Sequence, residues 1–392
     1  ALGYFALNAN TDGHSNTALG SEAGKAITTG DENVAIGHGA LDGATTANGN
    51  TAVGTDTMGS ASYAGGNNTA VGYNALLVST TGSGLTAIGN QALDANTTAS
   101  NNTAVGSAAL GAATTGGLNV AVGTFAGDAM TTATQNVAIG YNSLSAACGN
   151  SNVAVGAGAL ASTTGADNTA VGDIAGNSVS TGSRNVCVGG NAGSGITTGN
   201  DNTIMGRAAG DALTTGSQNV MAGGANAFSG TNAHNQIVLG YGVTSAGNSN
   251  FTFGDGSIDS NIAFGATTIT APSDIRLKED IQDTEAGLSF INDLRPVTFR
   301  WKKEKDISPE LNAYREGSET RTMNDKINHG FIAQEVKAVI DAHDEIKNGF
   351  DLWQEDETDG RQRIGASSLE TILVKAIQEL STEIDEIKKK LH

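Results

Sequence analysis

A glycine recurs at an almost constant interval through the first two-thirds of this 392-residue chain. Eleven of the fourteen intervals between these glycines are 17 residues, two are 16 and one is 18. A fixed short period is the signature of a repeat protein, in which one small unit stacks on the next. Residues 1–240 are therefore not an ordinary globular enzyme. The glycines are Gly3, Gly20, Gly37, Gly54, Gly72, Gly89, Gly106, Gly123, Gly140, Gly156, Gly172, Gly189, Gly206, Gly223 and Gly240.

Each glycine closes a short phrase, as in Asn168–Gly172, which reads Asn-Thr-Ala-Val-Gly. The β-branched residues on either side of the alanine favour a strand, and the alanine faces the other way. A second phrase follows, such as Asn74–Leu76, and then a turn that is often Thr-Thr-Gly. We predict two short strands and two turns per unit, which make one coil of a parallel β-solenoid. About fourteen coils at roughly 4.8 Å each would form a rod of roughly 70 Å.

The coil is small and rich in alanine, so it encloses little core, and its second face of small residues also needs cover. We predict that identical chains supply this cover by packing around a common axis. Twelve of the fourteen phrases from Gly20 onwards carry Asn four places before the glycine, and Leu85 and Gln236 are the departures. This column predicts stacked Asn side chains that hydrogen-bond one another at a corner.

The repeats resemble the head repeats of trimeric autotransporter adhesins, and phage fibres carry similar repeats. The resemblance covers residues 1–240 and rests on phrases such as Asn136–Gly140 and Asn168–Gly172. It implies a homotrimeric β-roll, but it is weak as a guide to function.

Charge is spread unevenly over a chain whose formal net charge is −19. Residues 1–272 hold three basic and 14 acidic residues, and residues 273–392 hold 18 basic and 26 acidic residues. We predict β-solenoid repeats over 1–240, a β-rich transition segment over 241–272 and a separate domain over 273–392. The acidic balance argues against binding nucleic acid, which needs a basic surface. No apolar run is long enough to span a bilayer, so we expect no membrane insertion.

The last third mixes helices and strands. Residues 283–294 are predicted to form a short amphipathic helix, 297–302 a strand, and 330–340 a loop that leads into a helix. The polar stretches 303–327 and 341–363 are predicted to be long loops or arms.

A heptad pattern marks the C-terminal helix. Ile377 and Ile384 fall at a-type positions and Leu380 and Ile387 at d-type positions. Isoleucine at both kinds of position favours trimers over dimers. A helix that packs on its own domain remains the alternative. The full apolar series is Leu373, Ile377, Leu380, Ile384, Ile387 and Leu391.

Four blocks in the last third occur in the order typical of one family. They are Ser273–Lys278, Leu294–Trp301, Gly330–Glu335 and Ala376–Leu380. Together they resemble the endosialidase-type intramolecular chaperone domain of phage tail spikes and fibres, over residues 273–392. The resemblance implies that the domain trimerises, helps three chains to fold and then cuts itself off. The implied fold is an α+β chaperone domain that ends in a trimeric coiled-coil helix.

The resemblance also implies the residues of self-cleavage. The Ser–Lys dyad falls on Ser273 and Lys278, the cleaved bond is Pro272–Ser273, and Asp274 and Arg276 have a supporting role. A serine hydroxyl needs an adjacent base, and a lysine can be that base where burial lowers its pKa. Positions i and i+5 lie about 140° apart on an α-helix, so the pair needs a loop geometry or a lysine from a neighbouring chain. Without the resemblance, Ser273 and Asp274 would be read as a helix cap and Lys278 as a solvated charge.

The predicted protein is a homotrimeric phage tail fibre located in the virion. Its partners would be a glycan or protein receptor on the host surface and other tail proteins, reached through an N-terminal region that we expect to be missing. Its only enzymatic step would be the single-turnover self-cleavage. The alternatives are a bacterial trimeric adhesin on the cell surface and, ranked lower, an ice- or surface-binding solenoid that needs an unbroken flat Thr array.

No cofactor or metal is expected, because the histidines lack metal-ligand spacing and the repeats do not spell a calcium motif. We interpret Cys187 as a small buried residue that is not bridged to Cys148.

Overall fold

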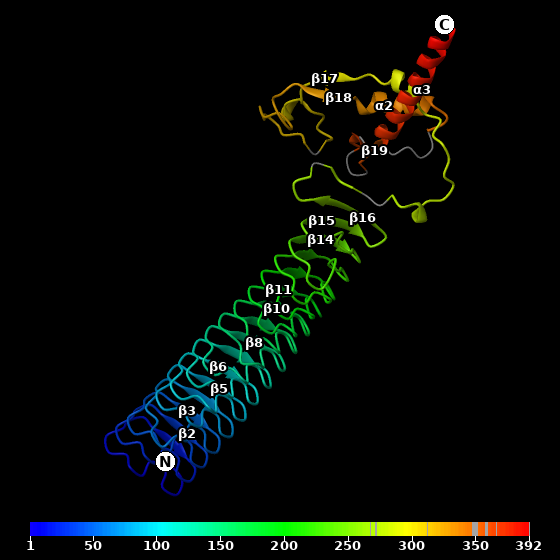
Figure 1. The fold of residues 1–392 in the computed structure, drawn as a ribbon. Helices are drawn as coiled ribbons and strands as arrows, with labels where there is room; N and C mark the ends of the chain where they lie inside the picture. The colour runs from blue at the N-terminus through cyan, green and yellow to red at the C-terminus, as the bar shows by residue number, and fades with distance from the viewer. Residues whose placement is uncertain are drawn as a thin grey trace. The chain divides into compact units, whose positions relative to one another are not determined.

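The computed structural model describes residues 1–392 except 267, 271–272, 312, 347–351, 357–359, 366 and 392. Contacts within the chain divide it into two compact units, Ala1–Ser273 and Asp274–His392 (Figure 1). No helix among the described residues is long and apolar enough to cross a membrane.

The first unit is the predicted parallel β-solenoid, with about fourteen stacked coils (Figure 1). Strands β1 to β15 lie side by side in chain order, and each pairs in parallel with the next. The last strand, β16, pairs antiparallel with β15. Strand bounds are β1 Thr17–Leu19, β2 Val34–Ile36, β3 Thr51–Val53, β4 Thr69–Val71, β5 Thr86–Ile88, β6 Thr103–Val105, β7 Val120–Val122, β8 Val137–Ile139, β9 Val153–Val155, β10 Thr169–Val171, β11 Val186–Val188, β12 Thr203–Met205, β13 Val220–Ala222, β14 Gln236–Tyr241, β15 Asn250–Asp255 and β16 Ile258–Ala263.

Each coil holds one strand, so the prediction of a second strand was wrong. The second phrase of the repeat contains two left-handed residues separated by one other, for example Asn74 (φ 55°) and Leu76 (φ 56°). An extended strand cannot include this conformation. The segment still stacks, because the Leu76 N–H donates to the Ala92 carbonyl of the next coil at 2.9 Å.

The recurrent glycine is required by its backbone and by its neighbour. Gly123 has φ 137°, which side-chain-bearing residues rarely adopt, and a Cβ there would lie 2.6 Å from the Gly140 carbonyl oxygen. The same contact repeats between successive coils of the solenoid. The interval between glycines in the sequence is therefore the number of residues in one coil, because each of these glycines must lie beside the equivalent glycine of the next coil.

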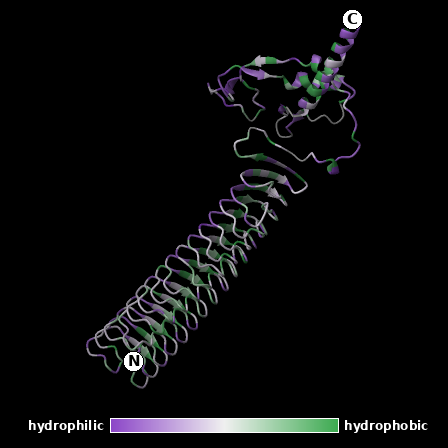
Figure 2. Cartoon of the chain, in the orientation of Figure 1, coloured by the Kyte–Doolittle hydropathy of each residue, from purple (hydrophilic) through white to green (hydrophobic). Residues whose placement is uncertain are grey.

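The middle residue of strands β1 to β13, which is alanine in β1 to β10, points into the coil. Ala121 and Ala138 are fully buried there, and the chain itself closes this interior. The remaining space inside the coil is filled by side chains from different positions of the repeat. Leu110 fills it in one coil and Met130 fills it in the next, where Gly127 leaves room for the Met130 side chain. The small-residue face therefore does not need the cover from other chains that the sequence suggested. Hydrophobic residues follow the strands along the solenoid (Figure 2).

The asparagine column forms the predicted ladder. The Asn168 Nδ2 donates to Asn152 Oδ1 at 3.2 Å and to the Gly182 carbonyl at 2.9 Å. Its Oδ1 accepts the Asn185 backbone N–H at 3.0 Å. Asn168 is fully buried, so each of these bonds satisfies a polar group that water cannot reach. Cys187 is buried as predicted, and Cys148 and Cys187 are both free thiols.

The second unit differs in detail from the predicted elements. The first helix begins at Leu288 instead of residue 283, and the strand that follows ends at Phe299 instead of residue 302. Two antiparallel strands, Trp353–Glu355 and Gln362–Ile364, lie at the end of the stretch 341–363 that was predicted as a loop. The elements are η1 Ile275–Leu277, α1 Leu288–Asp293, β17 Val297–Phe299, η2 Glu304–Asp306, β18 Asn328–Gly330, α2 Ala333–Ala342, β19 Trp353–Glu355, β20 Gln362–Ile364 and α3 Ser367–Leu391.

One small core joins the three α-helices of this unit. Phe290 of α1 is fully buried and belongs to the same cluster as Val336 and Ile340 of α2 and Ile372 of α3. The terminal helix is therefore tied to its own domain through one face.

Replacing Asn168 by Ala should destabilise the solenoid. The change leaves the Asn185 N–H and the Gly182 carbonyl buried without their present partner, at a cost of about 1–3 kcal/mol for each group. Thermal unfolding followed by far-ultraviolet circular dichroism measures the loss. Asn90→Ala is the matched control, because Asn90 is exposed. Equal melting temperatures for the two variants would contradict a stabilising ladder.

Candidate functional site

The predicted dyad flanks a single turn of 3-10 helix, η1. The Asp274 carboxylate caps this turn by accepting the Arg276 backbone N–H at 2.9 Å. It also accepts the Arg276 guanidinium through Nε at 3.0 Å and Nη2 at 2.6 Å. These bonds, first of all those from the side chain, lower the pKa of Asp274. Asp274 and Arg276, to which the resemblance gave a supporting role, therefore contact each other.

Ser273 and Lys278 lie on either side of this capped turn. Both are exposed, Ser273 at the end of the first unit and Lys278 within the second. Lys278 is extended and its N–H donates to the Ile275 carbonyl at 3.2 Å, so the connection is a loop and not the α-helix that would separate the pair. Pro272, and with it the predicted scissile bond, lies outside the described residues.

Large apolar side chains surround the turn without cover. Ile275, Leu277 and Ile281 are 73%, 70% and 63% exposed. Exposed apolar groups this close together are typical of a surface that another molecule covers. A single chain therefore leaves this segment open to water.

The sequence blocks of the chaperone resemblance meet in the second unit. Strand β17, from the block that contains Pro296, pairs antiparallel with β18, so that Val297 lies opposite Gly330. Arg295 just before β17 forms a two-bonded ion pair with Glu335 of α2, with Nε donating to Oε2 at 3.0 Å. Pairing of these blocks is thus part of how the domain folds.

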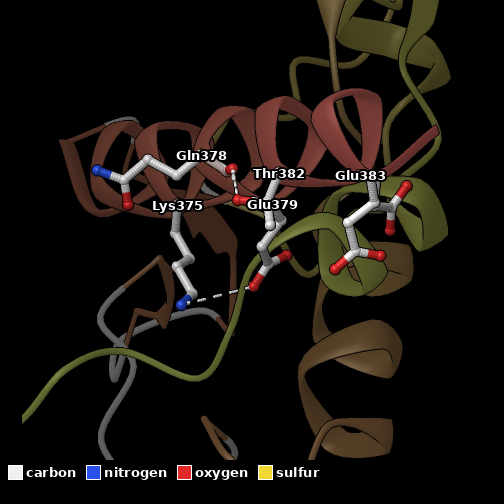
Figure 3. A pocket seen from close by; sticks show the side chains of 6 residues that line it. Lys375, Gln378, Glu379, Thr382 and Glu383 are labelled. Atoms are coloured by element: carbon white, nitrogen blue, oxygen red, sulfur yellow. Dashed lines mark hydrogen bonds and ion pairs between the residues drawn. The ribbon is translucent and has the colours of Figure 1, made fainter. Parts of the chain in front are cut away.

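Helix α3 is anchored to the N-terminus of α1 by Glu379. Its Oε2 accepts the Leu288 N–H at 2.7 Å, across 91 residues of sequence. An N-terminal N–H of a helix has no partner within the helix, so the carboxylate satisfies it and also opposes the helix dipole. Figure 3 shows Glu379 on the polar side of α3, with Lys375 3.7 Å from its other oxygen.

Another side of α3 is apolar and uncovered. Ile377, Ile384 and Ile387 are 64%, 49% and 54% exposed, whereas Ile372 and Ala376 are 2% and 3% exposed. The helix therefore packs on its own domain through Ile372 and Ala376 and leaves the predicted heptad stripe open. Packing on its own domain is thus confirmed for one face of α3, and the coiled coil stays a prediction for the exposed stripe.

Residues 273–345 match the family model described as chaperone of endosialidase. The match begins at the predicted nucleophile and ends before β19. The C-terminal unit carries a chaperone-of-endosialidase domain. A chaperone-of-endosialidase domain that follows a β-solenoid indicates a protein of the phage tail-fibre or tail-spike type. Comparison with curated proteins and with solved structures finds no match.

One polar cluster in this chaperone domain was missed by the sequence analysis. His343, which caps the C-terminus of α2, is buried with Nδ1 2.8 Å from Glu345 and Nε2 3.0 Å from Asp293 at the end of α1. The His343 and Phe290 rings are nearly perpendicular, with their centroids 5.3 Å apart. The hydrogen bonds to Glu345, and then to Asp293, raise the pKa of His343. Asp293 is 50 residues away in sequence, so no local pattern signals the cluster.

His343→Ala should weaken the chaperone domain more at pH 6 than at pH 9. A raised folded-state pKa means that the stabilisation is complete below the ordinary value near 6.5 and is lost as pH rises through the folded value. Both tryptophans, Trp301 and Trp353, lie in this unit, so tryptophan fluorescence during thermal unfolding reports on it.

The control for this measurement is His329→Ala, because His329 is exposed on β18. Its melting temperature should differ from that of the unchanged chain by the same amount at both pH values. If His343→Ala lowers the melting temperature equally at pH 6 and pH 9, stabilisation by a protonated His343 between Glu345 and Asp293 is contradicted.

Proposed function

We propose that this protein is a homotrimeric phage tail fibre that attaches the virion to the host surface. The solenoid is its body and its receptor-contacting part, and the receptor is a glycan or protein. The chaperone domain trimerises the chain, assists its folding and then separates from it. The observation that carries the proposal is the chaperone-of-endosialidase match, which starts at Ser273, the residue at which the first compact unit ends.

In the proposed self-cleavage, the Ser273 hydroxyl oxygen attacks the carbonyl carbon of Pro272. Lys278 accepts the hydroxyl proton and returns it to the leaving nitrogen, which is that of Ser273 itself. The carbon–nitrogen bond breaks and an ester between Pro272 and the Ser273 side chain remains. Water then hydrolyses this ester, so the body ends at a Pro272 carboxylate and the released domain begins with the free amine of Ser273.

The exposure of the dyad makes assembly part of the mechanism. A lysine accepts a proton from serine only where desolvation or a nearby charge favours its neutral form. Lys278 is exposed in one chain, as are the apolar residues Ile275 and Leu277 beside it. Packing of further copies over this segment would supply the dry surroundings. The proposal holds whether Lys278 acts on its own chain or on a neighbour.

The exposed heptad stripe of α3 supports a parallel oligomer. With Ile384 at an a-type position, Glu383 falls at g and Lys388 at e of the next heptad. In a parallel, in-register coiled coil these two positions of neighbouring helices face each other, so the charges are complementary. Within one chain Lys388 lies 3.3 Å from Asp385 and both are exposed, so Lys388 can also reach a partner helix.

The unchanged chain should split into a body that ends at Pro272 and a 120-residue fragment that starts at Ser273. Ser273→Ala and Lys278→Ala should each leave a folded, full-length chain, because each removes one half of the dyad. The measurement is denaturing mass spectrometry after long incubation at mildly alkaline pH.

Two variants serve as controls for the loss of cleavage. Ser257→Ala and Lys326→Ala change an exposed serine and an exposed lysine away from the junction, and both should cleave like the unchanged chain. A folded, unchanged chain that stays whole would make the domain a chaperone without protease activity. Cleavage of Lys278→Ala at the unchanged rate would exclude Lys278 as the base.

Deletion of residues 367–392 should give insoluble or misfolded protein. Each coil pairs only with the neighbouring coils, about 17 residues away, so one chain alone does not align the copies with one another. Chains that fold without alignment leave apolar surface and strand edges exposed, and such species aggregate. Without α3 the copies have no aligned starting point. The yield of soluble protein and its mass by light scattering measure the effect. A normal yield of soluble trimer from the truncated chain would exclude this role for α3.

A further inference from the structure

We propose that the outward surface of the solenoid strands packs against the same surface of two other copies of this chain. We call this surface the strand face. It consists of the first and third residues of strands β1 to β13. The inference rests on the proposed homotrimer and goes beyond it by naming the surface through which the bodies meet.

The strand face carries no charge. Of its 26 side chains, the third-position column is apolar throughout and the first-position column holds seven threonines and six valines. The solenoid has acidic residues in many coils, yet none of them lies in these columns. The first column is Thr17, Val34, Thr51, Thr69, Thr86, Thr103, Val120, Val137, Val153, Thr169, Val186, Thr203 and Val220, and the third is Leu19, Ile36, Val53, Val71, Ile88, Val105, Val122, Ile139, Val155, Val171, Val188, Met205 and Ala222.

The strand face is accessible in one chain. Ile88, Val122 and Ile139 are 39%, 37% and 38% exposed, whereas the alanine between the two columns is buried in each coil with that residue. A sheet that faces water normally places polar residues on that side. The face is about 60 Å long and 10 Å wide by strand geometry, or roughly 600 Å², the upper end of what a monomer exposes.

The spacing between side-chain rows on the strand face indicates that its partner is another copy of this chain. All thirteen strands pair in register, so the side-chain rows repeat at a single strand spacing along the whole stack. A surface can match these rows over the full length only if it repeats at the same spacing. A second copy of this solenoid does so, with equal numbers of coils. The parallel heptad stripe of α3 keeps the copies pointing in the same direction, which is the orientation that brings each coil to its equivalent.

A regular inorganic lattice fits the face less well. An ice- or surface-binding solenoid needs an unbroken flat array of threonines, and valine interrupts this column at six strands. The interruptions include three successive strands, at Val120, Val137 and Val153. Threonine and valine have nearly the same shape, so both fit equivalent positions along a contact between protein chains, where the threonine hydroxyls can form hydrogen bonds.

Thiol cross-linking of the full chain tests the proposal. The two native cysteines are first replaced by alanine, and a single cysteine is then introduced as Val122→Cys on the strand face. Thr132→Cys is the matched control, because Thr132 lies exposed in the same stretch of chain but outside the strands. A short bismaleimide should join two chains covalently through position 122 and not through position 132. Light scattering on both proteins gives the oligomeric state beforehand.

The possible outcomes distinguish the strand-face proposal from the proposal of a trimer. A trimer that cross-links at position 132 but not at 122, or at neither position, overturns the strand face and leaves the trimer standing. A monomer overturns both proposals. If Val122→Cys fails to fold, as judged by circular dichroism, Ile88→Cys supplies the same test 34 residues earlier, two coils away, with Thr98→Cys as its control.

Discussion

The whole solenoid depends on placing equivalent backbone atoms of successive coils one strand spacing apart. That distance leaves no room for a Cβ where Gly123 lies beside the Gly140 carbonyl, and it brings each asparagine within hydrogen-bond reach of the next. The glycine column and the asparagine column thus have the same geometric cause. They also fix the register, because a slip of one residue would put a side chain where only glycine fits and would leave buried amides unpaired.

Left-handed leucines show what this stacking costs and what offsets the cost. Leu110 and Leu144 have φ of 51° and 49°, a conformation that costs roughly 1–2 kcal/mol for a residue with a Cβ. Both side chains are fully buried in the coil, which contributes about 1.5–3 kcal/mol. Where Gly127 takes this place, Met130 fills the interior instead. Each coil therefore closes its own inside, and the apolar surface that remains lies outside, on the strands.

The period, the strand positions, the buried alanines and the asparagine ladder could all be predicted, because each depends on residues at fixed spacing. The second strand was wrong because residues such as Leu76 carry no local sign that their φ is positive. Contacts between distant segments were also out of reach: nothing in the sequence pairs Glu379 with Leu288, or His343 with Asp293. For the junction, the dyad of Ser273 and Lys278 stays a prediction from a motif, and the structure adds the capped turn between these two residues.

Both units leave large apolar side chains exposed in a single chain. This exposure suggests an order for assembly and cleavage in the proposed mechanism. Exposed in a single chain are Ile275 and Leu277 beside the dyad, Ile377 and Ile384 on α3, and the strand face, and in the proposed trimer other copies would cover them. Ser273 and Lys278 belong to a segment that is open to water in a single chain. A cleavage that requires desolvation is then slow in a lone chain and fast in an assembled one. The chaperone domain would accordingly stay attached for as long as the body still needs aligned chains, without any separate signal to delay it.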